Sequence, residues 1–332
     1  MKQVVYVANS DSKQIQVISI NDKKILNLIQ TIEVHGQIQP LKVIKKYKIL
    51  YAGIRPNFHI LFFKIGSNGT LKKISKIYIT NSINHISSDF YNKYLFCSSY
   101  HGNCLIIISL DDKGIPKNNV QIINNINGCH FSKVVGKNNF LCVTSLKDDS
   151  INLYKFVNHQ KIVLKKHFII KTSKNSGPRH IVIHPNINIM YSINELTGNI
   201  DVWKIDLNLN TLNFLKSINI NYINSKNNFW SADIHITTSG KYLYTTDRMH
   251  NIISLFKVNL DGEIFNIKNY KTEIQPRSFY IDYYDKYLIV AGEISNKITI
   301  YKIANNGYLK FLMDFKVGKR PIWVLIYKLN NN

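Results

Sequence analysis

The chain has 332 residues, of which 45% are hydrophobic and 12% aromatic, and it carries a formal net charge of +23 at pH 7. This hydrophobic content is ample for a packed core, and no apolar run approaches the roughly 18 residues of a membrane span. A nucleic-acid partner is not expected either. The lysines are scattered singly or in pairs, without an arginine-rich arm, zinc-finger spacing or an RNA-binding aromatic signature.

The N-terminus and the cysteines indicate the compartment. The segment MKQVVYVANS has too short an apolar run for a secretory signal peptide. The four cysteines, Cys97, Cys104, Cys129 and Cys142, follow no metal-ligand or redox spacing. We therefore expect reduced thiols in a cytoplasmic protein that works as a monomer.

A hairpin unit recurs seven times along the chain: an apolar cluster, a turn rich in Asn, Asp, Ser or Gly, and a second, alternating strand. The units span 4–20, 49–65, 94–110, 140–156, 189–205, 242–258 and 287–303. Their equivalent positions are separated by 45, 45, 46, 49, 53 and 45 residues, and are Tyr6, Tyr51, Phe96, Cys142, Tyr191, Tyr244 and Ile289. A regular period of this length indicates a repeat architecture.

Two further strands complete each period. A short segment precedes each hairpin from residue 39 onward, in the forms QPLKVI, NHISSD, CHFSKV, PRHIVIHP, ADIHIT, PRSFYI and RPIWVLI. A more polar strand follows each hairpin, as in LKKISKIYI at 71–79. Four antiparallel strands per period, seven times, predict an all-β, seven-bladed β-propeller. Because no linker or composition shift interrupts the periods, we expect one domain over 1–332.

The two ends of the chain predict how the ring closes. The chain begins at a second strand, residues 3–9, whereas its last strand, residues 320–327, has the pattern of a first strand. We name the four strands of a blade A to D, from the innermost strand outward and in chain order. The last blade should therefore combine a strand A from the C-terminus with strands B, C and D from the N-terminus. Such a pairing ties the ring together across the two termini.

Arginine is rare in this chain: only five of the 43 basic residues are arginine, and four of those five adjoin a proline. Lysine cannot replace a guanidinium that binds a carboxylate or phosphate through two donors, so we interpret the arginines as pointers to an anion site. The alternative is an accident of small numbers. In a four-stranded blade the D-to-A connections and the B-to-C turns open on the same face. This face should hold all five arginines, Arg55, Arg179, Arg248, Arg277 and Arg320.

The same rule places other reactive side chains on that face. His130 begins a strand A, and Glu195 ends a strand B; His85, Lys147, Tyr100 and His101 also belong there. A carboxylate, an imidazole and several guanidiniums at one pocket mouth suit ester hydrolysis. The carboxylate or the imidazole can deprotonate water, and arginines can hold an oxyanion.

Several segments resemble one family from end to end. They are MKQVVYVANS, GQIQP, GIRPNF, NGCHFS, GPRHIVIHPN, NELTGNIDVW, WSADIHITTSGKYLY, IQPRSF and VGKRPIWV, and they are similar to the bacterial propeller-type 6-phosphogluconolactonases (the cycloisomerase 2 or lactonase propeller family). That family also resembles the propeller muconate-lactonizing enzymes. The resemblance implies hydrolysis of 6-phospho-D-glucono-1,5-lactone to 6-phosphogluconate in the oxidative pentose phosphate pathway, without a cofactor. It also implies an active-site set of His130, Arg179, Glu195 and Arg277. Ser278, after Arg277, stands where glycine is commoner.

The expected roles follow the chemistry of lactone hydrolysis. We expect Glu195 to act as general base, and His130 to donate a proton to the ring oxygen or to exchange roles with Glu195. Arg179 and Arg277 would polarise the lactone carbonyl. The phosphate of the phosphorylated sugar lactone would be bound by Arg55, Lys147 and Arg320.

A metal site is not expected. His180 and His184 lie four residues apart on one strand, about 13 Å at about 3.3 Å per residue, too far to share an ion. We expect them, and His235, to be structural or hydrogen-bonding residues. The channel-facing segments carry few carboxylates apart from Asp233 and Glu195.

Other side chains have structural interpretations. Trp203, Trp230 and Trp323 are expected to pack in the core or rim, and Asp89 and Asp282 to cap turns on the opposite face. Arg248 suits a salt bridge as well as a functional role.

Two other functions remain open. The chain could be a non-catalytic propeller that binds an acidic partner, or a lactonase for a muconate-type lactone.

Overall fold

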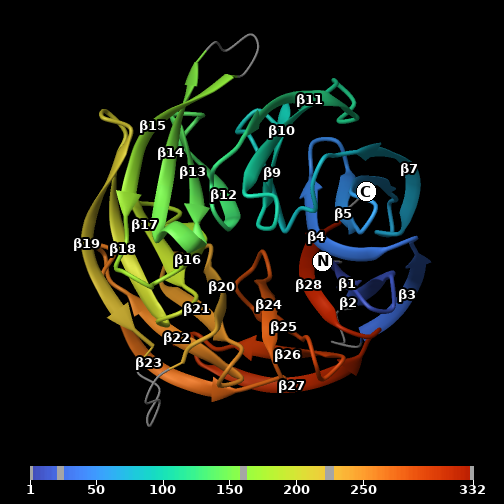
Figure 1. The fold of residues 1–332 in the computed structure, drawn as a ribbon. Coiled ribbons are helices and arrows are strands. Elements are labelled where there is room, and N and C mark those ends of the chain that lie inside the picture. Colours follow the sequence, from blue (N-terminus) through green and yellow to red (C-terminus); the bar gives the residue numbers. More distant parts are fainter. Residues whose placement is uncertain (1–2, 21–25, 158–162, 221–227, 330–332) are drawn as a thin grey trace.

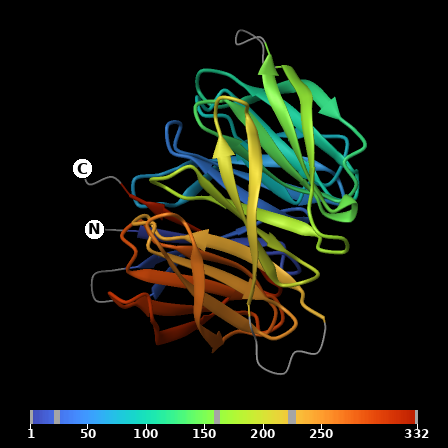
Figure 2. The same cartoon turned by 90° about the vertical axis from the view of Figure 1, so that its left-hand side faces the viewer.

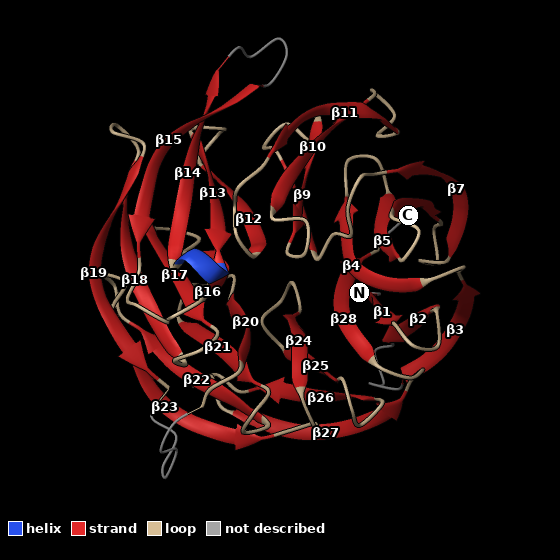
Figure 3. Cartoon of the chain, in the orientation of Figure 1, coloured by secondary structure: helices blue, strands red, loops and turns tan. Residues whose placement is uncertain are grey.

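The ring of blades predicted from the repeats is confirmed. The computed structural model describes residues 3–20, 26–157, 163–220 and 228–329. In this part of the chain, 28 strands form seven antiparallel sheets of four strands each, arranged around a central channel (Figure 1). The remaining regular element is one short 3-10 turn, η1 (Leu146–Asp148), drawn in blue in Figure 3.

Six blades are continuous in sequence, and each runs from the channel outward. Blade one holds β4 (Gln37–Ile44), β5 (Ile49–Arg55), β6 (His59–Ile65) and β7 (Leu71–Tyr78). Blade two holds β8 (His85–Ser88), β9 (Tyr94–Ser99), β10 (Cys104–Leu110) and β11 (Pro116–Ile123). Blade three holds β12 (Cys129–Val135), β13 (Phe140–Ser145), β14 (Ser150–Val157) and β15 (Val163–Lys171).

The next three blades repeat the order. Blade four holds β16 (Pro178–Ile183), β17 (Ile189–Asn194), β18 (Asn199–Asp206) and β19 (Thr211–Asn219). Blade five holds β20 (Ser231–Ile236), β21 (Tyr242–Asp247), β22 (Ile252–Val258) and β23 (Ile264–Lys271). Blade six holds β24 (Pro276–Ile281), β25 (Tyr287–Gly292), β26 (Lys297–Ile303) and β27 (Leu309–Lys316).

The seventh blade closes the ring as the chain ends predicted. Its order is β28 (Pro321–Lys328), β1 (Gln3–Asn9), β2 (Gln14–Ile20) and β3 (Leu26–Glu33). β28 pairs antiparallel with β1, with Gln3 opposite Lys328 and Asn9 opposite Pro321. Backbone hydrogen bonds between the first and last strands therefore hold the ring shut.

Burial between neighbouring blades explains the hydrophobic pattern of the repeats. The second strands, such as β9 and β13, are buried along their whole length, whereas outer strands such as β7 and β11 are mostly exposed. Apolar clusters lie between the sheets of neighbouring blades. Figure 2 shows the blades after a turn of 90° from the view of Figure 1. A single blade could not bury these apolar faces alone, so the blades depend on packing against their neighbours.

The recurring tyrosine of the repeat has a definite structural role. The buried hydroxyls of Tyr6, Tyr51, Tyr191 and Tyr244 donate hydrogen bonds to the carbonyls of Gly69, Gly114, Gly262 and Gly307, at 2.8, 2.6, 2.8 and 2.6 Å. Each glycine lies in the turn between the third and fourth strands of the next blade. These bonds fix the position of one blade relative to the next.

Asp89 and Asp282 cap turns at the far ends of inner strands, as expected. Asp89 accepts hydrogen bonds from the backbone amides of Lys93 and Tyr94 at 2.6 and 2.7 Å. Asp282 accepts from those of Lys286 and Tyr287 at 2.6 and 2.8 Å. This mode of capping is typical of Asx turns.

Candidate active site

All five arginines line one pocket. The pocket has a volume of about 280 Å³ and lies at the end of the channel where the inner strands begin. We call it the arginine pocket. Besides the five arginines, the ionisable side chains that line it are those of Glu195, His130, Tyr100 and His101. The predicted convergence of the arginines on one face is therefore confirmed.

Bulges in the inner strands direct three of these side chains into the pocket. The pairing of β16 with β17 skips Arg179, and that of β24 with β25 skips Arg277. The pairing of β12 with β13 likewise shifts between Cys129 and Ser132, around His130. A bulge leaves one residue out of the ladder and redirects its side chain, which explains why these residues leave the regular alternation of the strand.

A second repeated position supplies four more residues of the pocket, Arg55, Tyr100, Glu195 and Arg248. The residue four positions after the recurring tyrosine ends each second strand or directly follows it. In successive repeats this residue is Ser10, Arg55, Tyr100, Leu146, Glu195, Arg248 and Glu293. Glu293 was missed in the sequence analysis, although it occupies the same place in its repeat as Glu195.

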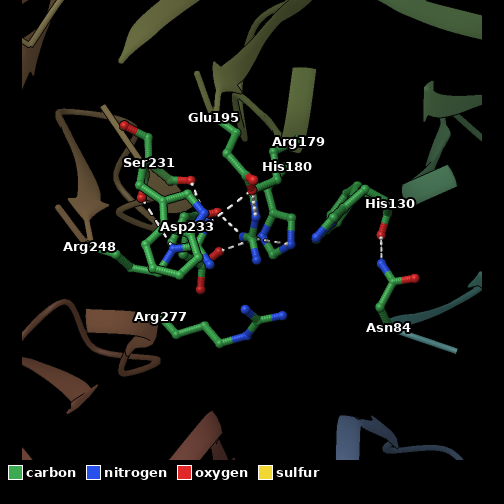
Figure 4. Close-up of polar contacts among 12 residues, drawn as sticks. Asn84, His130, Arg179, His180, Glu195, Ser231, Asp233, Arg248 and Arg277 are labelled. Carbon is green, nitrogen blue, oxygen red and sulfur yellow. Dashed lines mark hydrogen bonds and ion pairs between the residues drawn. The ribbon is translucent and has the colours of Figure 1, made fainter. Parts of the chain in front are cut away.

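Glu195 is held between two arginines (Figure 4). Its Oε2 lies 2.7 Å from Arg179 Nε and 2.9 Å from Arg248 Nη2. Arg248 also lies over the Trp230 ring, with its guanidinium carbon 3.8 Å from the ring centroid. Among the described residues, Glu195 Oε1 has no hydrogen-bond or ion-pair partner, so this oxygen can accept a proton from water.

The two arginines remain charged despite their burial. Arg179 is 2% exposed and Arg248 is 3% exposed. Burial lowers the pKa of Arg179 to about 10, and burial together with the charge of Arg179 lowers that of Arg248 to about 9, against the opposing effect of Glu195. Of the two roles considered for Arg248, the structure shows the salt bridge, which Arg248 forms with Glu195 inside the pocket.

A second carboxylate, Glu293, also lies between two arginines, two blades further along the chain than Glu195. Glu293 Oε1 lies 2.8 Å from Arg320 Nε, and Glu293 Oε2 lies 4.0 Å from Arg277 Nη1. Arg320 also approaches the exposed Asp11 at 3.6 Å. Arg277 has the looser contact of the two, so its guanidinium is available to a ligand.

His130 is neutral and buried at the pocket wall. Burial, followed by the charges of Arg179, His180, Arg277 and Arg248, lowers the pKa of His130 well below 6.5. Its Nδ1 is buried without a hydrogen-bond partner among the described residues. Its backbone carbonyl accepts a hydrogen bond from Asn84 Nδ2 at 2.6 Å (Figure 4). A neutral imidazole has one nitrogen that can accept a proton and one N–H that can donate a hydrogen bond, but it lacks the second proton of an imidazolium.

His180 and Asp233 connect to the guanidinium of Arg179. His180 Nδ1 lies 2.8 Å from Asp233 Oδ1, and His180 Nε2 lies 3.2 Å from Arg179 Nη1. Because a guanidinium only donates, His180 must accept at Nε2 and donate from Nδ1 to the carboxylate. Arg179 also donates to the Ala232 carbonyl. His180 is therefore a hydrogen-bonding residue, as expected.

The charges of this pair suit that tautomer. Burial and the charge of Arg179 lower the pKa of His180 to about 4. Burial of Asp233 favours its protonated form, but His235 and His180 hold the pKa of this carboxyl well below its usual value. At neutral pH the imidazole is neutral and the carboxylate is charged.

The three residues predicted to bind the phosphate are placed differently. Arg55 and Arg320 line the pocket. Arg55 donates to Gln37 Oε1 at 3.0 Å, and no carboxylate of the described residues lies within ion-pair distance of it. Lys147, in η1, does not line the pocket; its Nζ lies 5.0 Å from the ring centroid of Tyr100.

Other expected residues also lie in different surroundings. His85 is in the channel beyond the pocket, stacked on Phe131 with ring centroids 3.8 Å apart, so it is absent from the arginine pocket. Trp203 is core and Trp323 lines the channel, whereas Trp230 lines the pocket beneath Arg248.

No group of three or more His, Cys, Asp or Glu side chains in the described part of the chain is arranged to hold a metal ion. His184 instead makes hydrogen bonds, with the Gly240 carbonyl at 3.2 Å and the Asn186 amide at 3.1 Å. No helix within the described ranges is long and apolar enough to cross a membrane.

A ring of seven four-stranded sheets, with an arginine-rich pocket at one mouth of its channel, defines the class as a seven-bladed β-propeller. The chain belongs to the family described as "Lactonase, 7-bladed beta-propeller", whose model matches residues 4–326.

Curated relatives support the assignment. A 6-phosphogluconolactonase of Buchnera aphidicola subsp. Acyrthosiphon pisum is 46% identical over 99% of this chain and 100% of its own length. One of Photorhabdus laumondii is 39% identical, again over 99% of this chain and 100% of its own length.

Solved structures share the fold at low sequence identity. The periplasmic gluconolactonase PpgL of Pseudomonas aeruginosa superposes with a TM-score of 0.91 at 16% identity, covering 99% of this chain and 100% of that one. A putative 6-phosphogluconolactonase of Bacteroides fragilis gives a TM-score of 0.88 at 21% identity, covering 98% of both chains.

Proposed function

We propose that this chain is a 6-phosphogluconolactonase, a carboxylic ester hydrolase that opens 6-phospho-D-glucono-1,5-lactone to 6-phosphogluconate in the oxidative pentose phosphate pathway. The names of its full-length relatives support the reaction. The observation that carries the proposal is the charge of the arginine pocket.

The charge of the pocket matches this substrate. Five guanidiniums line it, and the two carboxylates paired with them inside the ring are Glu195 and Glu293, which leaves an excess of three positive charges. A phosphate monoester contributes up to two negative charges at neutral pH, and attack on the lactone creates one more on the carbonyl oxygen. The excess is what the transition state of a phosphorylated lactone requires.

The proposed chemistry uses residues on both sides of the pocket. A water oxygen bonds to the lactone carbonyl carbon while its proton passes to Glu195 Oε1. The bond from that carbon to the ring oxygen then breaks. The ring oxygen receives that proton from Glu195 Oε1 and accepts a hydrogen bond from His130. Arg179 and Arg277 stabilise the oxyanion between these steps.

His130 and Glu195 could also exchange roles. Two guanidiniums engage Oε2 of Glu195, whereas the imidazole of His130 is neutral and has a nitrogen that can accept a proton, although burial and the charges of the arginines lower its pKa. The substrate phosphate is assigned to Arg55 and Arg320, with Lys147 behind Tyr100 contributing its charge from the rim.

Hydrolysis of 6-phosphogluconolactone beside unphosphorylated gluconolactone, each with and without chelator, tests the proposal. We expect a much higher kcat/KM for the phosphorylated lactone and no effect of chelator. Indifference to the phosphate, or hydrolysis of a muconate-type lactone instead, would contradict the substrate assignment. Absence of any hydrolysis would favour the non-catalytic scaffold.

The remaining proposals concern the state of the protein in the cell. We place the enzyme in the cytoplasm as a single-domain monomer. Its four cysteines are buried and unpaired, as thiols in a reducing compartment are. Sedimentation and the free-thiol content of the native protein test these points.

A further inference from the structure

A second cavity, of about 260 Å³, lies in the channel directly beyond the arginine pocket. It begins one residue further along the inner strands. Arg179 lines the pocket and the next residue, His180, lines the cavity; likewise His130 lines the pocket and Phe131 lines the cavity. The Phe131 ring lies 4.7 Å from that of His180, so aromatic rings stand between the two spaces. We call this space the channel cavity.

Three lysines line the channel cavity; the ammonium group of Lys45 lies over the Tyr283 ring, 3.7 Å from its centroid, and the other two are considered as one wall. Lys42 is on β4 and Lys133 is on β12, either side of the short strand β8. Ser87 on β8 and Ser132 on β12 also line the cavity, and their hydroxyls are hydrogen-bonded to each other at 2.8 Å. No carboxylate of the described residues lies within ion-pair distance of either ammonium group. This wall therefore presents two cations and two hydroxyls to a space that could hold a small molecule.

The lysines destabilise each other in this setting. Burial and the charge of Lys133 lower the pKa of Lys42 to about 8, and burial lowers the pKa of Lys133. Two like charges in a partly dehydrated space are unfavourable unless a counter-charge accompanies them.

The carboxylate in the cavity wall does not supply that counter-charge. Asp233 already interacts with His180 at 2.8 Å and with His235 at 3.4 Å. It also accepts hydrogen bonds from the backbone amides of Ile234 and Phe279 at 3.0 and 3.2 Å. These four interactions use both carboxylate oxygens, so the positive charge of the lysines remains unbalanced.

We propose that the channel cavity is a second anion site, in which Lys42 and Lys133 bind a small oxyanion of the size of inorganic phosphate. The two ammonium groups, which come from strands on either side of β8, supply charge-assisted hydrogen bonds to the anion. This site is separate from the arginine pocket and does not depend on the activity proposed for it.

Calorimetric titration of the full chain with inorganic phosphate at pH 7 tests the proposal. The comparison is between the unaltered protein, Lys42→Met/Lys133→Met, and Lys137→Met, an exposed lysine in the turn after β12. Because each charged hydrogen bond is typically worth about tenfold or more in affinity, the double variant should bind phosphate in the channel at least roughly tenfold more weakly. The Lys137 variant should bind as the unaltered protein does.

A further variant separates the two sites. Arg55→Met should weaken phosphate binding in the arginine pocket and leave channel binding intact. Equal titrations for the unaltered protein and the double variant would overturn the proposal, as would loss of all phosphate binding in Arg55→Met.

A crystallographic arm covers the case in which the double variant does not fold. Crystals of the unaltered protein soaked in selenate should show anomalous density between Lys42 and Lys133. Density confined to the arginine pocket would refute the channel site.

Discussion

Asp233→Asn should slow catalysis although Asp233 lies outside the set of residues expected to touch substrate. Its Oδ1 accepts from His180 Nδ1 at 2.8 Å, which leaves His180 Nε2 as an acceptor 3.2 Å from Arg179 Nη1. An asparagine removes the negative charge and no longer enforces this tautomer. The guanidinium of Arg179 then loses one of the contacts that aim it at the lactone carbonyl.

The size of the effect follows from the interactions lost. A hydrogen bond to a charged group contributes about 1.5–3 kcal/mol. If that contribution is made mainly in the transition state, kcat falls by roughly 10- to 150-fold while KM changes little.

The assay is steady-state hydrolysis of 6-phosphogluconolactone, with folding checked by thermal melting. Asp282→Asn is the matched control, because Asp282 is also buried but caps a turn at the far end of β24. We expect the control to lower the melting temperature without changing kcat. A kcat for Asp233→Asn within twofold of the unaltered enzyme, or an equal loss in both variants, would refute the positioning role.

Three further predictions address the base, the phosphate and pH. Glu195→Gln should lower kcat by roughly 10²–10⁴-fold with binding intact. If Glu195→Gln left kcat unchanged and His130→Gln instead lowered it by this factor, the general base would be His130. Arg55→Met should raise KM for the phosphorylated lactone by roughly tenfold and leave unphosphorylated gluconolactone hydrolysis unaffected; equal effects on both lactones would argue against a phosphate contact. His180 has a pKa of about 4 in the folded protein, against about 6.5 for a free histidine, so the unfolded chain binds more protons in this window. The contribution of His180 to stability should therefore be full above pH 6.5 and fall by roughly 3 kcal/mol towards pH 4, and the buried His85 and His130 add to the total fall seen in urea titrations. His180→Gln should flatten that fall, and an unaltered slope would contradict the burial of a neutral imidazole.

The sequence was sufficient for the blades and for the face of the ring that carries the site. The period near 45 residues and the mismatched chain ends predict the number of blades and the pairing of β28 with β1, because strand alternation and hairpin turns are local properties. Antiparallel geometry then determines which connections share a face.

The pairing of charges within the pocket was harder to predict. Glu293 joins Arg277 of its own blade to Arg320 of the next blade, and Glu195 likewise pairs with Arg248 of the next blade. Such contacts depend on side-chain conformations and on the bulges that redirect Arg179 and Arg277, neither of which a hydrophobic pattern encodes. A comparison of the seven repeats at the position four residues after the tyrosine would have revealed Glu293.

Lys147 and His85 show where the topological rule is too coarse. The rule places a residue at one end of a strand, but it does not say whether the side chain reaches the cavity. Tyr100 stands beside Lys147, and the bulges that turn inner-strand residues into the pocket are absent from the pairing of β8 with β9, where His85 begins the strand.

The contacts also explain why two of the five arginines are not lysine, in a chain whose other 38 basic residues are lysine. Arg179 reaches Glu195, His180 and the Ala232 carbonyl from a single planar group. Arg248 binds Glu195 and the Trp230 carbonyl while its plane lies on the Trp230 ring. An ammonium group is a compact point charge that cannot stack or bridge in this way. Replacement by lysine would keep the pocket's net charge but lose the geometry that leaves Glu195 Oε1 exposed to water.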